Sequence, residues 1–149
     1  MSEDSARFDK ARERVRSALA AMGAGDAAPY IDCWAASDDA TLFGAWGPIE
    51  KGHDRLVETF RWVGGRFRGG ALVPEDVVAF ESGDLAYTVG FEQGEVVVDR
   101  GAPMPMTIRV THIYRRIEGE WRLVHRHADF PPADQRDGPR RAGVHGGAA

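Results

Sequence analysis

From residue 71 to residue 130 the apolar side chains recur at every second position, and this period of two most constrains the fold. Alternation of this kind is typical of β-strands with one buried face. Pro131 and Pro132 end the stretch, because proline has no backbone N–H with which to continue a strand ladder. We therefore expect a meander of four antiparallel strands. The expected strands cover residues 72–80, residues 85–99 and the two arms of a hairpin over residues 106–130.

Apolar residues before this stretch recur at intervals of three and four, the spacing of an amphipathic helix. The expected helices cover residues 5–22, a segment that begins after Asp26, and a segment from His53 or Asp54 to about Phe67. Two short strands are expected between the second and third helices, at residues 40–43 and within residues 44–52. This order predicts an α+β fold in which about three N-terminal helices cover the concave face of a strongly bent antiparallel sheet. Gly90 and Gly94, inside the longest strand, are expected to mark the bends.

The composition favours one domain and a small-molecule or protein partner. We expect a single domain over residues 1–132, followed by a disordered tail over residues 133–149 that is rich in Gly, Pro and Arg. A formal net charge of -4 argues against nucleic acid or an anionic membrane as partner. No apolar stretch approaches the roughly 18 residues of a membrane span, and the N-terminus lacks the apolar region of a signal peptide. The sequence therefore predicts a cytoplasmic protein, and its lone cysteine, Cys33, excludes an internal disulfide.

The C-terminal hairpin holds three of the five histidines. On its first strand the even positions are mostly apolar and include His112 and Tyr114, so we expect them on the concave face. On the return strand the odd positions from Trp121 to His127, including His125, are expected to face inward. A two-residue turn at Gly119 and Glu120 would then pair His112 with His127 and Tyr114 with His125.

Three pieces of the sequence carry a family resemblance. They are Gly25-Asp26, the run from Asp38-Asp39-Ala40-Thr41 to Gly44 with the later Gly52-His53, and Thr111-His112-Ile113-Tyr114 followed by Gly119-Glu120-Trp121 and His125-Arg126-His127. Together they resemble the SnoaL-like branch of the nuclear transport factor 2-like (NTF2-like) superfamily, also called ketosteroid-isomerase-like. The resemblance implies a cone-shaped α+β fold. It leaves the function open, since the superfamily includes isomerases, cyclases, dehydratases and kinase association domains.

Ketosteroid isomerase chemistry fits this chain only with altered residues. The family's carboxylate base follows the Asp-Asp-Ala-Thr segment, where this chain has Gly44, and the acidic oxyanion donor falls at or beside His112. The ending also resembles the calcium/calmodulin-dependent kinase association domain, in which the pocket serves assembly and ligand binding. Two functions therefore stay open: a cofactor-independent isomerase, cyclase or lyase acting on a hydrophobic carbonyl compound, and a non-catalytic ligand-binding or association module.

The candidate site residues follow from these readings. Candidate catalytic residues are His112, His125, His127, Tyr114 and Asp129, in which Asp129 would orient a histidine. Candidate pocket residues are the aromatic side chains of Tyr30, Trp34, Phe43, Trp46, Phe60 and Phe91, with core packing as the alternative. A zinc site formed by the three hairpin histidines is a further alternative, although no metal or cofactor is expected.

The outer face of the sheet is expected to mediate a homodimer or to be a solvated charged surface. Its expected residues are Arg109, Arg115, Arg122, Val124 and Arg126.

Overall fold

The computed structural model of the chain describes residues 3–133 and contains three helices and seven strands in that range. The helices are α1 (Glu3–Gly23), α2 (Ala28–Asp32) and α3 (His53–Arg66). The strands are β1 (Thr41–Phe43), β2 (Ile49–Lys51), β3 (Phe67–Gly70), β4 (Val73–Ser82), β5 (Leu85–Val98), β6 (Met104–Ile117) and β7 (Glu120–Asp129). The predicted disordered tail lies, from residue 134 on, outside the described residues.

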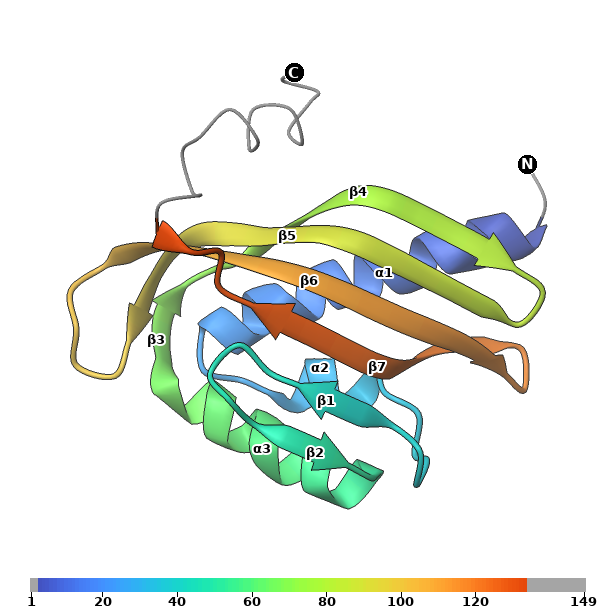
Figure 1. Ribbon diagram of the computed structural model, residues 1–149, viewed down its shortest axis with the longest axis horizontal. Helices are drawn as coiled ribbons and strands as arrows, with labels where there is room; N and C mark the ends of the chain where they lie inside the picture. The colour runs from blue at the N-terminus through green and yellow to red at the C-terminus, as the bar shows by residue number, and fades with distance from the viewer. Residues whose placement is uncertain (1–2, 134–149) are drawn as a thin grey trace.

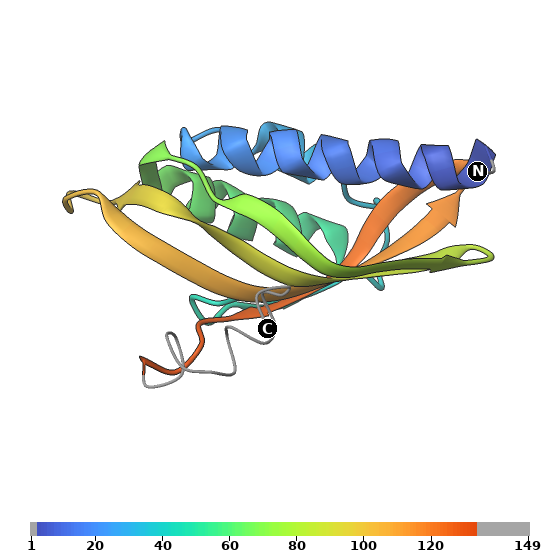
Figure 2. The ribbon, with the colours of Figure 1, turned by 90° about the horizontal axis from the view of Figure 1, so that it is seen from above.

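All seven strands form one sheet. Its order is β2-β1-β7-β6-β5-β3, and β4 pairs with the other part of β5 (Figure 1). Seen from above, the sheet is strongly bent, and the three helices lie on one of its faces (Figure 2). The α+β cone expected from the sequence is therefore confirmed. One pairing departs from an all-antiparallel sheet, since β1 runs parallel to β7.

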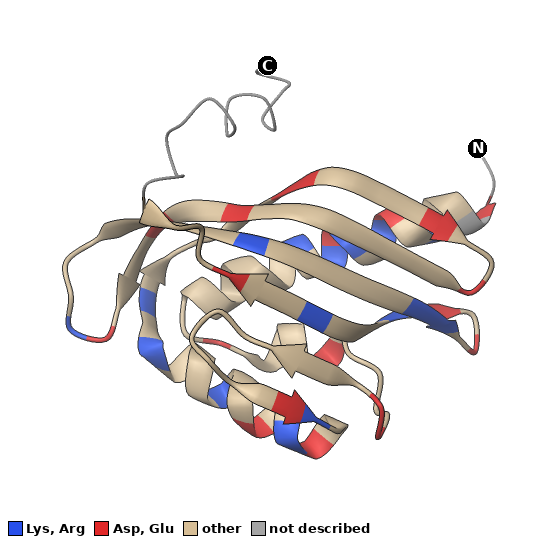
Figure 3. Ribbon diagram, viewed as in Figure 1, with Lys and Arg blue, Asp and Glu red and all other residues tan. Residues whose placement is uncertain are grey.

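The helical layer buries an apolar core against the concave face of the sheet. The core includes Phe8, Val15 and Leu19 from α1 and the side chains of Leu56 and Phe60 from α3. Charged residues are frequent on α1, α3 and the hairpin ends and sparse along the middle of the central strands (Figure 3). No helix among residues 3–133 is both long and apolar enough to cross a membrane.

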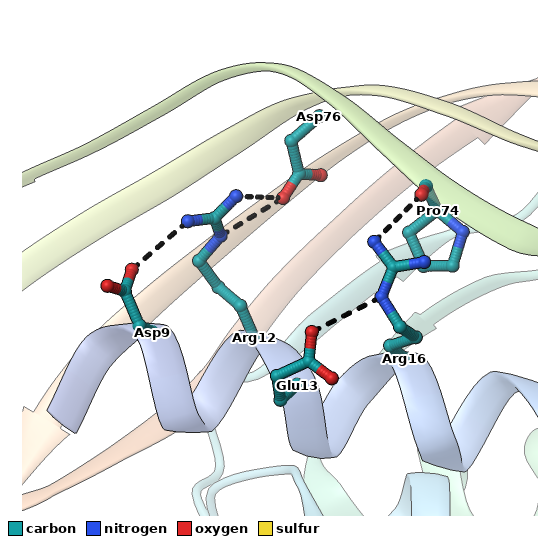
Figure 4. A network of polar contacts seen from close by, with 6 residues as sticks. All are labelled: Asp9, Arg12, Glu13, Arg16, Pro74 and Asp76. Atoms are coloured by element: carbon teal, nitrogen blue, oxygen red, sulfur yellow. Dashed lines mark hydrogen bonds and ion pairs between the residues drawn. The ribbon is translucent and has the colours of Figure 1, made fainter. Parts of the chain in front are cut away.

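Polar contacts fix α1 to β4. Arg12 donates from Nε and Nη2 to a carboxylate oxygen of Asp76, and Arg16 donates to the backbone oxygen of Pro74 (Figure 4). The backbone of β4 approaches β5 closely at Gly90, where an added Cβ would lie 2.1 Å from the backbone oxygen of Glu75. The sequence predicted a bend at this glycine; the structure shows instead that the position leaves no room for a side chain.

The C-terminal hairpin differs from the prediction at its turn. The two turn residues are Glu118 and Gly119, both with positive φ, so that Ile117 pairs with Glu120. Positive φ at both central residues is the geometry that matches the twist of the flanking strands. The predicted turn at Gly119 and Glu120 was wrong by one residue.

A β-bulge at Val124 then changes the faces of β7. Tyr114 pairs with Leu123, but the preceding Ile113 pairs with His125, so Val124 has no partner of its own. The bulge lies where the chain after α2 meets β7, with hydrogen bonds from Leu123 N to Cys33 O and from Ala35 N to Leu123 O, both 2.9 Å. Because an extra residue reverses the alternation of side chains, residues after Val124 point opposite to the direction that parity predicts.

Candidate functional site: a cavity with a buried ion pair

A cavity lies between the helices and the concave face of the sheet. The cavity, including its open mouth, encloses about 680 Å³ of space. Most lining side chains are apolar, including those of Leu19, Met22, Leu42, Trp46, Phe60, Val63, Phe67 and Ile108. The polar residues in the lining are Tyr30, Thr59, Glu92 and Arg126. A compact, mainly apolar ligand with a few polar atoms suits such a space.

The strongest polar feature of the cavity is an ion pair between Glu92 on β5 and Arg126 on β7. Arg126 donates to both carboxylate oxygens, from Nη1 to Oε2 at 2.7 Å and from Nη2 to Oε1 at 2.8 Å. The Glu92 side chain is 1% exposed and that of Arg126 is 11% exposed. This bidentate geometry fixes the guanidinium plane at the cavity wall.

His112 and Tyr30 extend this ion pair into a network. The Tyr30 hydroxyl, on α2, lies 2.6 Å from His112 Nε2, and Arg126 Nη1 lies 3.3 Å from the same nitrogen. Tyr30 also packs edge-on against Phe60 of α3, with ring centroids 5.0 Å apart. The network therefore joins a helix to three neighbouring strands, β5, β6 and β7.

Burial and charge set the protonation states of the network. Burial, together with the nearby Arg126 charge, lowers the pKa of His112 from 6.5 to about 3, so its imidazole is neutral. Burial alone would raise the pKa of Glu92, but the Arg126 charge outweighs it and the pKa is lowered. Burial raises the pKa of the Tyr30 hydroxyl, which stays protonated. Near neutral pH the network thus holds one carboxylate, one guanidinium, a neutral imidazole and a phenol.

Thr59 supplies a second polar position in the wall, on α3. Its hydroxyl donates to Glu50 Oε2 at 2.9 Å, and Glu50 also accepts from Arg55 Nε at 2.9 Å. These hydrogen bonds, that of Arg55 first, lower the pKa of Glu50 and keep it ionised. The proton of the Thr59 hydroxyl is therefore directed away from the cavity space, toward a carboxylate.

The structure separates the residues predicted as catalytic. His112 and Tyr114 are buried on the concave face, as parity on β6 predicted. The predicted pairs were wrong, because His112 pairs with Arg126 and Tyr114 with Leu123. Tyr114 packs against Phe8 and does not line the cavity.

The other three predicted catalytic residues lie on the outer face as a consequence of the bulge. His125 and His127 contact Phe43 edge-on, with ring centroids 5.8 and 5.5 Å apart. Asp129 forms an ion pair with Arg109. None of these side chains lines the cavity, so the common pocket expected for the histidines is not formed. Their catalytic roles stay predictions.

The aromatic residues predicted for the pocket divide in the same way. Tyr30, Trp46 and Phe60 line the cavity. Trp34 packs behind them, 5.2 Å from the Phe60 ring. The remaining two lie elsewhere, since Phe43 is half-exposed beside the outer histidines and Phe91 lines a groove on the outer face with Arg109 and Asp129.

Glu92 and the inward direction of Arg126 were missed by the sequence reading. A signal for Glu92 existed, because β5 pairs even positions with even positions of β6, which places Glu92 opposite Ile108 on the concave face. The signal for Arg126 was the adjacent apolar pair Leu123 and Val124, both buried, which breaks the alternation and marks the bulge. The assignment of Arg126 to a charged outer surface was wrong, because its guanidinium lines the inner cavity and pairs with Glu92.

The three hairpin histidines do not form a metal site. His112 lies on the opposite face of the sheet from His125 and His127, and within residues 3–133 no group of three or more His, Cys, Asp or Glu side chains is placed to hold a metal ion. The zinc alternative is therefore not supported by the geometry.

Comparisons with known proteins agree with the fold. A family model described as a SnoaL-like domain matches residues 12–133. Among curated proteins, no match to this chain is found.

Several solved structures resemble this one at low sequence identity. A proposed dehydratase of the NTF2-like family from Streptomyces avermitilis has a TM-score of 0.72 at 17% identity, with 87% of this chain and 97% of the other covered. A ketosteroid isomerase-like protein from Erwinia carotovora atroseptica has a TM-score of 0.71 at 20% identity, covering 89% and 99%. A proposed calcium/calmodulin-dependent protein kinase type II association domain from Thiobacillus denitrificans has a TM-score of 0.66 at 20% identity, covering 83% and 94%. At these identities the likeness concerns the fold alone.

Proposed function

The chain belongs to the SnoaL-like domain family, and from this premise we propose that it binds a small, mainly apolar ligand whose carbonyl oxygen accepts a hydrogen bond from Arg126. The observation that carries the proposal is the buried Glu92 and Arg126 pair in the wall of an otherwise apolar cavity. Burying two charges costs desolvation free energy, and apolar side chains of similar volume would fill the space at equal or greater stability. An ion pair at this position is therefore better explained by ligand recognition than by packing.

The protonation states favour binding over acid–base catalysis. A general base works best with a pKa near the working pH. The pKa values of Glu92 and His112 are both lowered, that of His112 to about 3, and both carboxylate oxygens of Glu92 accept from Arg126. These groups hold and orient hydrogen bonds near neutral pH without exchanging protons readily.

A titration with cyclohexanone followed by ligand-observed NMR tests the binding proposal. We expect saturable binding by the wild-type protein and none by Val63→Trp, which fills the cavity with an indole. Val73→Trp, at an exposed position on β4, is the matched control and keeps binding. Equal binding by the wild-type protein and Val63→Trp would place the ligand outside the cavity and refute the proposal.

Carbonyl-activating catalysis is the second candidate, and the contact of a buried carboxylate with a guanidinium in a mainly apolar cavity favours it. Glu92 would take a proton from the carbon next to the carbonyl, the electron pair would move to the carbonyl oxygen, and Arg126 would stabilise the resulting enolate. In a ketone with a double bond one carbon further on, the enolate is conjugated with that bond, and return of the proton to the far end of the double bond completes an isomerisation.

Deuterium exchange distinguishes the two candidates without knowledge of the natural substrate. Cyclohexanone in D₂O exchanges the protons next to its carbonyl slowly, and a catalyst of the second kind accelerates this exchange. The binding proposal predicts the same exchange rate with the wild-type protein and with Glu92→Gln. Exchange that the wild-type protein accelerates and Glu92→Gln does not would establish the enzyme.

We also propose that the outer face of β4 and β5 forms the contact of a homodimer. Apolar side chains are exposed along these two strands, namely Val77, Val78, Phe80, Leu85, Tyr87 and Val89. A contiguous apolar surface of this kind is typical of a protein interface. Light scattering should give twice the chain mass of 16.3 kDa for the wild-type protein and the single mass for Phe80→Lys. A monomeric wild-type protein at the same concentration would refute the dimer.

A further inference from the structure

The hydrogens in the cavity wall have defined directions, and these directions specify a ligand class. Arg126 Nη1 lies 3.3 Å from His112 Nε2. A guanidinium nitrogen can only donate, so Nε2 carries the lone pair and the proton of the neutral imidazole is on Nδ1.

This tautomer fixes the direction of the Tyr30 hydrogen bond. The Tyr30 hydroxyl lies 2.6 Å from the same Nε2, which has no hydrogen to give. Tyr30 therefore donates to His112, and toward a ligand in the cavity that Tyr30 lines, its oxygen can only accept. His112 is a positioning residue in this arrangement, because it acts on the ligand only through Tyr30.

The Thr59 hydroxyl, like that of Tyr30, has no hydrogen left to donate to a ligand, for an independent reason. Its only hydroxyl hydrogen is donated to the ionised Glu50, at 2.9 Å. Thr59 lines the cavity from the α3 side, and its Oγ1 has no second hydrogen to donate, so toward a ligand it can only accept. Arg126 also hydrogen-bonds the Tyr30 side chain. A ligand that carries only a carbonyl pairs with Arg126 but leaves the second lone pair of Tyr30 and the lone pairs of Thr59 without a donor.

We propose that the cavity selects compact ligands that carry a hydroxyl group together with a carbonyl, in preference to the corresponding plain ketones. The proposal rests on the ligand binding proposed above and adds the polarity of the second group. The carbonyl oxygen accepts from Arg126, and the hydroxyl donates to the lone pairs of Tyr30 or Thr59. A site with buried acceptors discriminates against an analogue that lacks the donor, because the acceptors then stay unpaired.

Two matched probes, 4-hydroxycyclohexanone and cyclohexanone, test the proposal by calorimetric titration. We expect the wild-type protein to bind the hydroxylated probe about tenfold more tightly. Tyr30→Phe and Thr59→Val each remove one acceptor with little change of shape, and at least one of them should bring the ratio of the two dissociation constants close to one. Tyr87→Phe, on the outer face, is the control and keeps the wild-type ratio.

The outcomes separate this inference from the proposed function. Equal affinity of the wild-type protein for both probes refutes the hydroxyl preference and leaves carbonyl binding intact. Failure of both probes to bind refutes the proposed function itself. An unchanged ratio in both cavity variants, with melting temperatures near that of the wild-type protein, refutes the roles of Tyr30 and Thr59.

A spectroscopic measurement tests the first step separately. The ¹⁵N resonances of the His112 ring distinguish a protonated from an unprotonated nitrogen. The inference requires an unprotonated Nε2 and a protonated Nδ1. A protonated Nε2 would reverse the Tyr30 hydrogen bond and refute the inference, whatever the fold of the variants.

Discussion

Two bidentate arginine–carboxylate pairs with similar hydrogen-bond lengths lie on opposite faces of the sheet. Arg109 donates to both oxygens of Asp129 at 2.6 and 2.9 Å, and Arg126 donates to both oxygens of Glu92 at 2.7 and 2.8 Å. The side chains of the outer pair are 46% and 50% exposed, whereas those of the inner pair are 11% and 1% exposed. Water solvates the outer charges and weakens their attraction, but the inner charges depend on each other.

The comparison indicates that burial sets how much the fold depends on an ion pair. Loss of the exposed outer pair should have little effect on stability. In the inner pair, the buried carboxylate would destabilise the fold if it had no partner, and the guanidinium is held at the wall of a cavity. Removal of the carboxylate charge from each pair in turn measures how much the stability of the fold depends on that pair.

The largest expected effect is on stability when one charge of the inner pair is removed. Glu92→Gln leaves Arg126 buried beside a neutral amide, and we expect a loss of about 3–5 kcal/mol in the free energy of unfolding. Asp129→Asn makes the same change on the outer face and should cost at most about 1 kcal/mol. Urea unfolding of both variants gives the values. Losses of equal size would contradict the distinction between the pairs.

A second large effect is expected from pH, through His112. Its pKa is lowered by burial, and further by the Arg126 charge, to about 3 in the folded chain, against 6.5 in an exposed histidine. Between these values the unfolded chain binds a proton that the folded chain does not. The free energy of unfolding should therefore fall by up to about 1.4 kcal/mol per unit as the pH decreases.

Urea unfolding at several pH values measures this slope. In His112→Asn, whose side chain does not titrate, the slope just below pH 6.5 should become flatter. A slope that is the same with and without His112 would show that this imidazole is not held neutral by burial.

Replacement of both inner charges should have a smaller effect on stability than removal of one. In the double variant Glu92→Leu with Arg126→Met no buried charge is left unpaired, and we expect stability within about 1 kcal/mol of the wild-type protein, or higher. Thermal unfolding of the double variant, of Glu92→Gln and of the wild-type protein provides the comparison. A double variant as unstable as the single one would assign the ion pair a structural role and weaken the case for recognition.

The smallest expected effect concerns Trp46, which lines the cavity and is covered by Arg66. The guanidinium carbon of Arg66 lies 4.0 Å from the Trp46 ring centroid and 5.3 Å from that of Trp62. Removal of this cation–π contact in Arg66→Ala should cost about 1 kcal/mol or less. We expect faster dissociation of cyclohexanone by NMR line shape, whereas Arg7→Ala, at an exposed pair on α1, leaves the rate unchanged. An unchanged rate in Arg66→Ala would show that Trp46 does not retain the ligand.

Much of the fold could be predicted from the sequence, because the spacing of apolar residues follows the two periods of helix and strand. The inward positions of His112 and Tyr114 were correct for this reason. The prediction that odd positions of β7 face inward was wrong after Val124. The bulge at this residue places His125 and His127 on the outer face. A bulge depends on backbone contacts far along the chain, here those of Cys33 and Ala35, and a periodic pattern does not contain them.

The site was only partly predictable for a related reason. Tyr30, Trp46 and Phe60 are bulky and apolar, so their place at a cavity followed from their spacing and type. The partnership of Glu92 and Arg126 joins residues 34 positions apart and requires the registers of two strand pairs at once. A single register error on β7 was enough to assign Arg126 to the solvent.

The most direct test of the central claim is the affinity for cyclohexanone when each ion pair is replaced. Three proteins are titrated by calorimetry: the wild-type protein, Glu92→Leu with Arg126→Met, and Asp129→Asn with Arg109→Met. The account predicts that affinity falls at least about tenfold in the inner variant and is unchanged in the outer one. Wild-type affinity in a folded inner variant would contradict it.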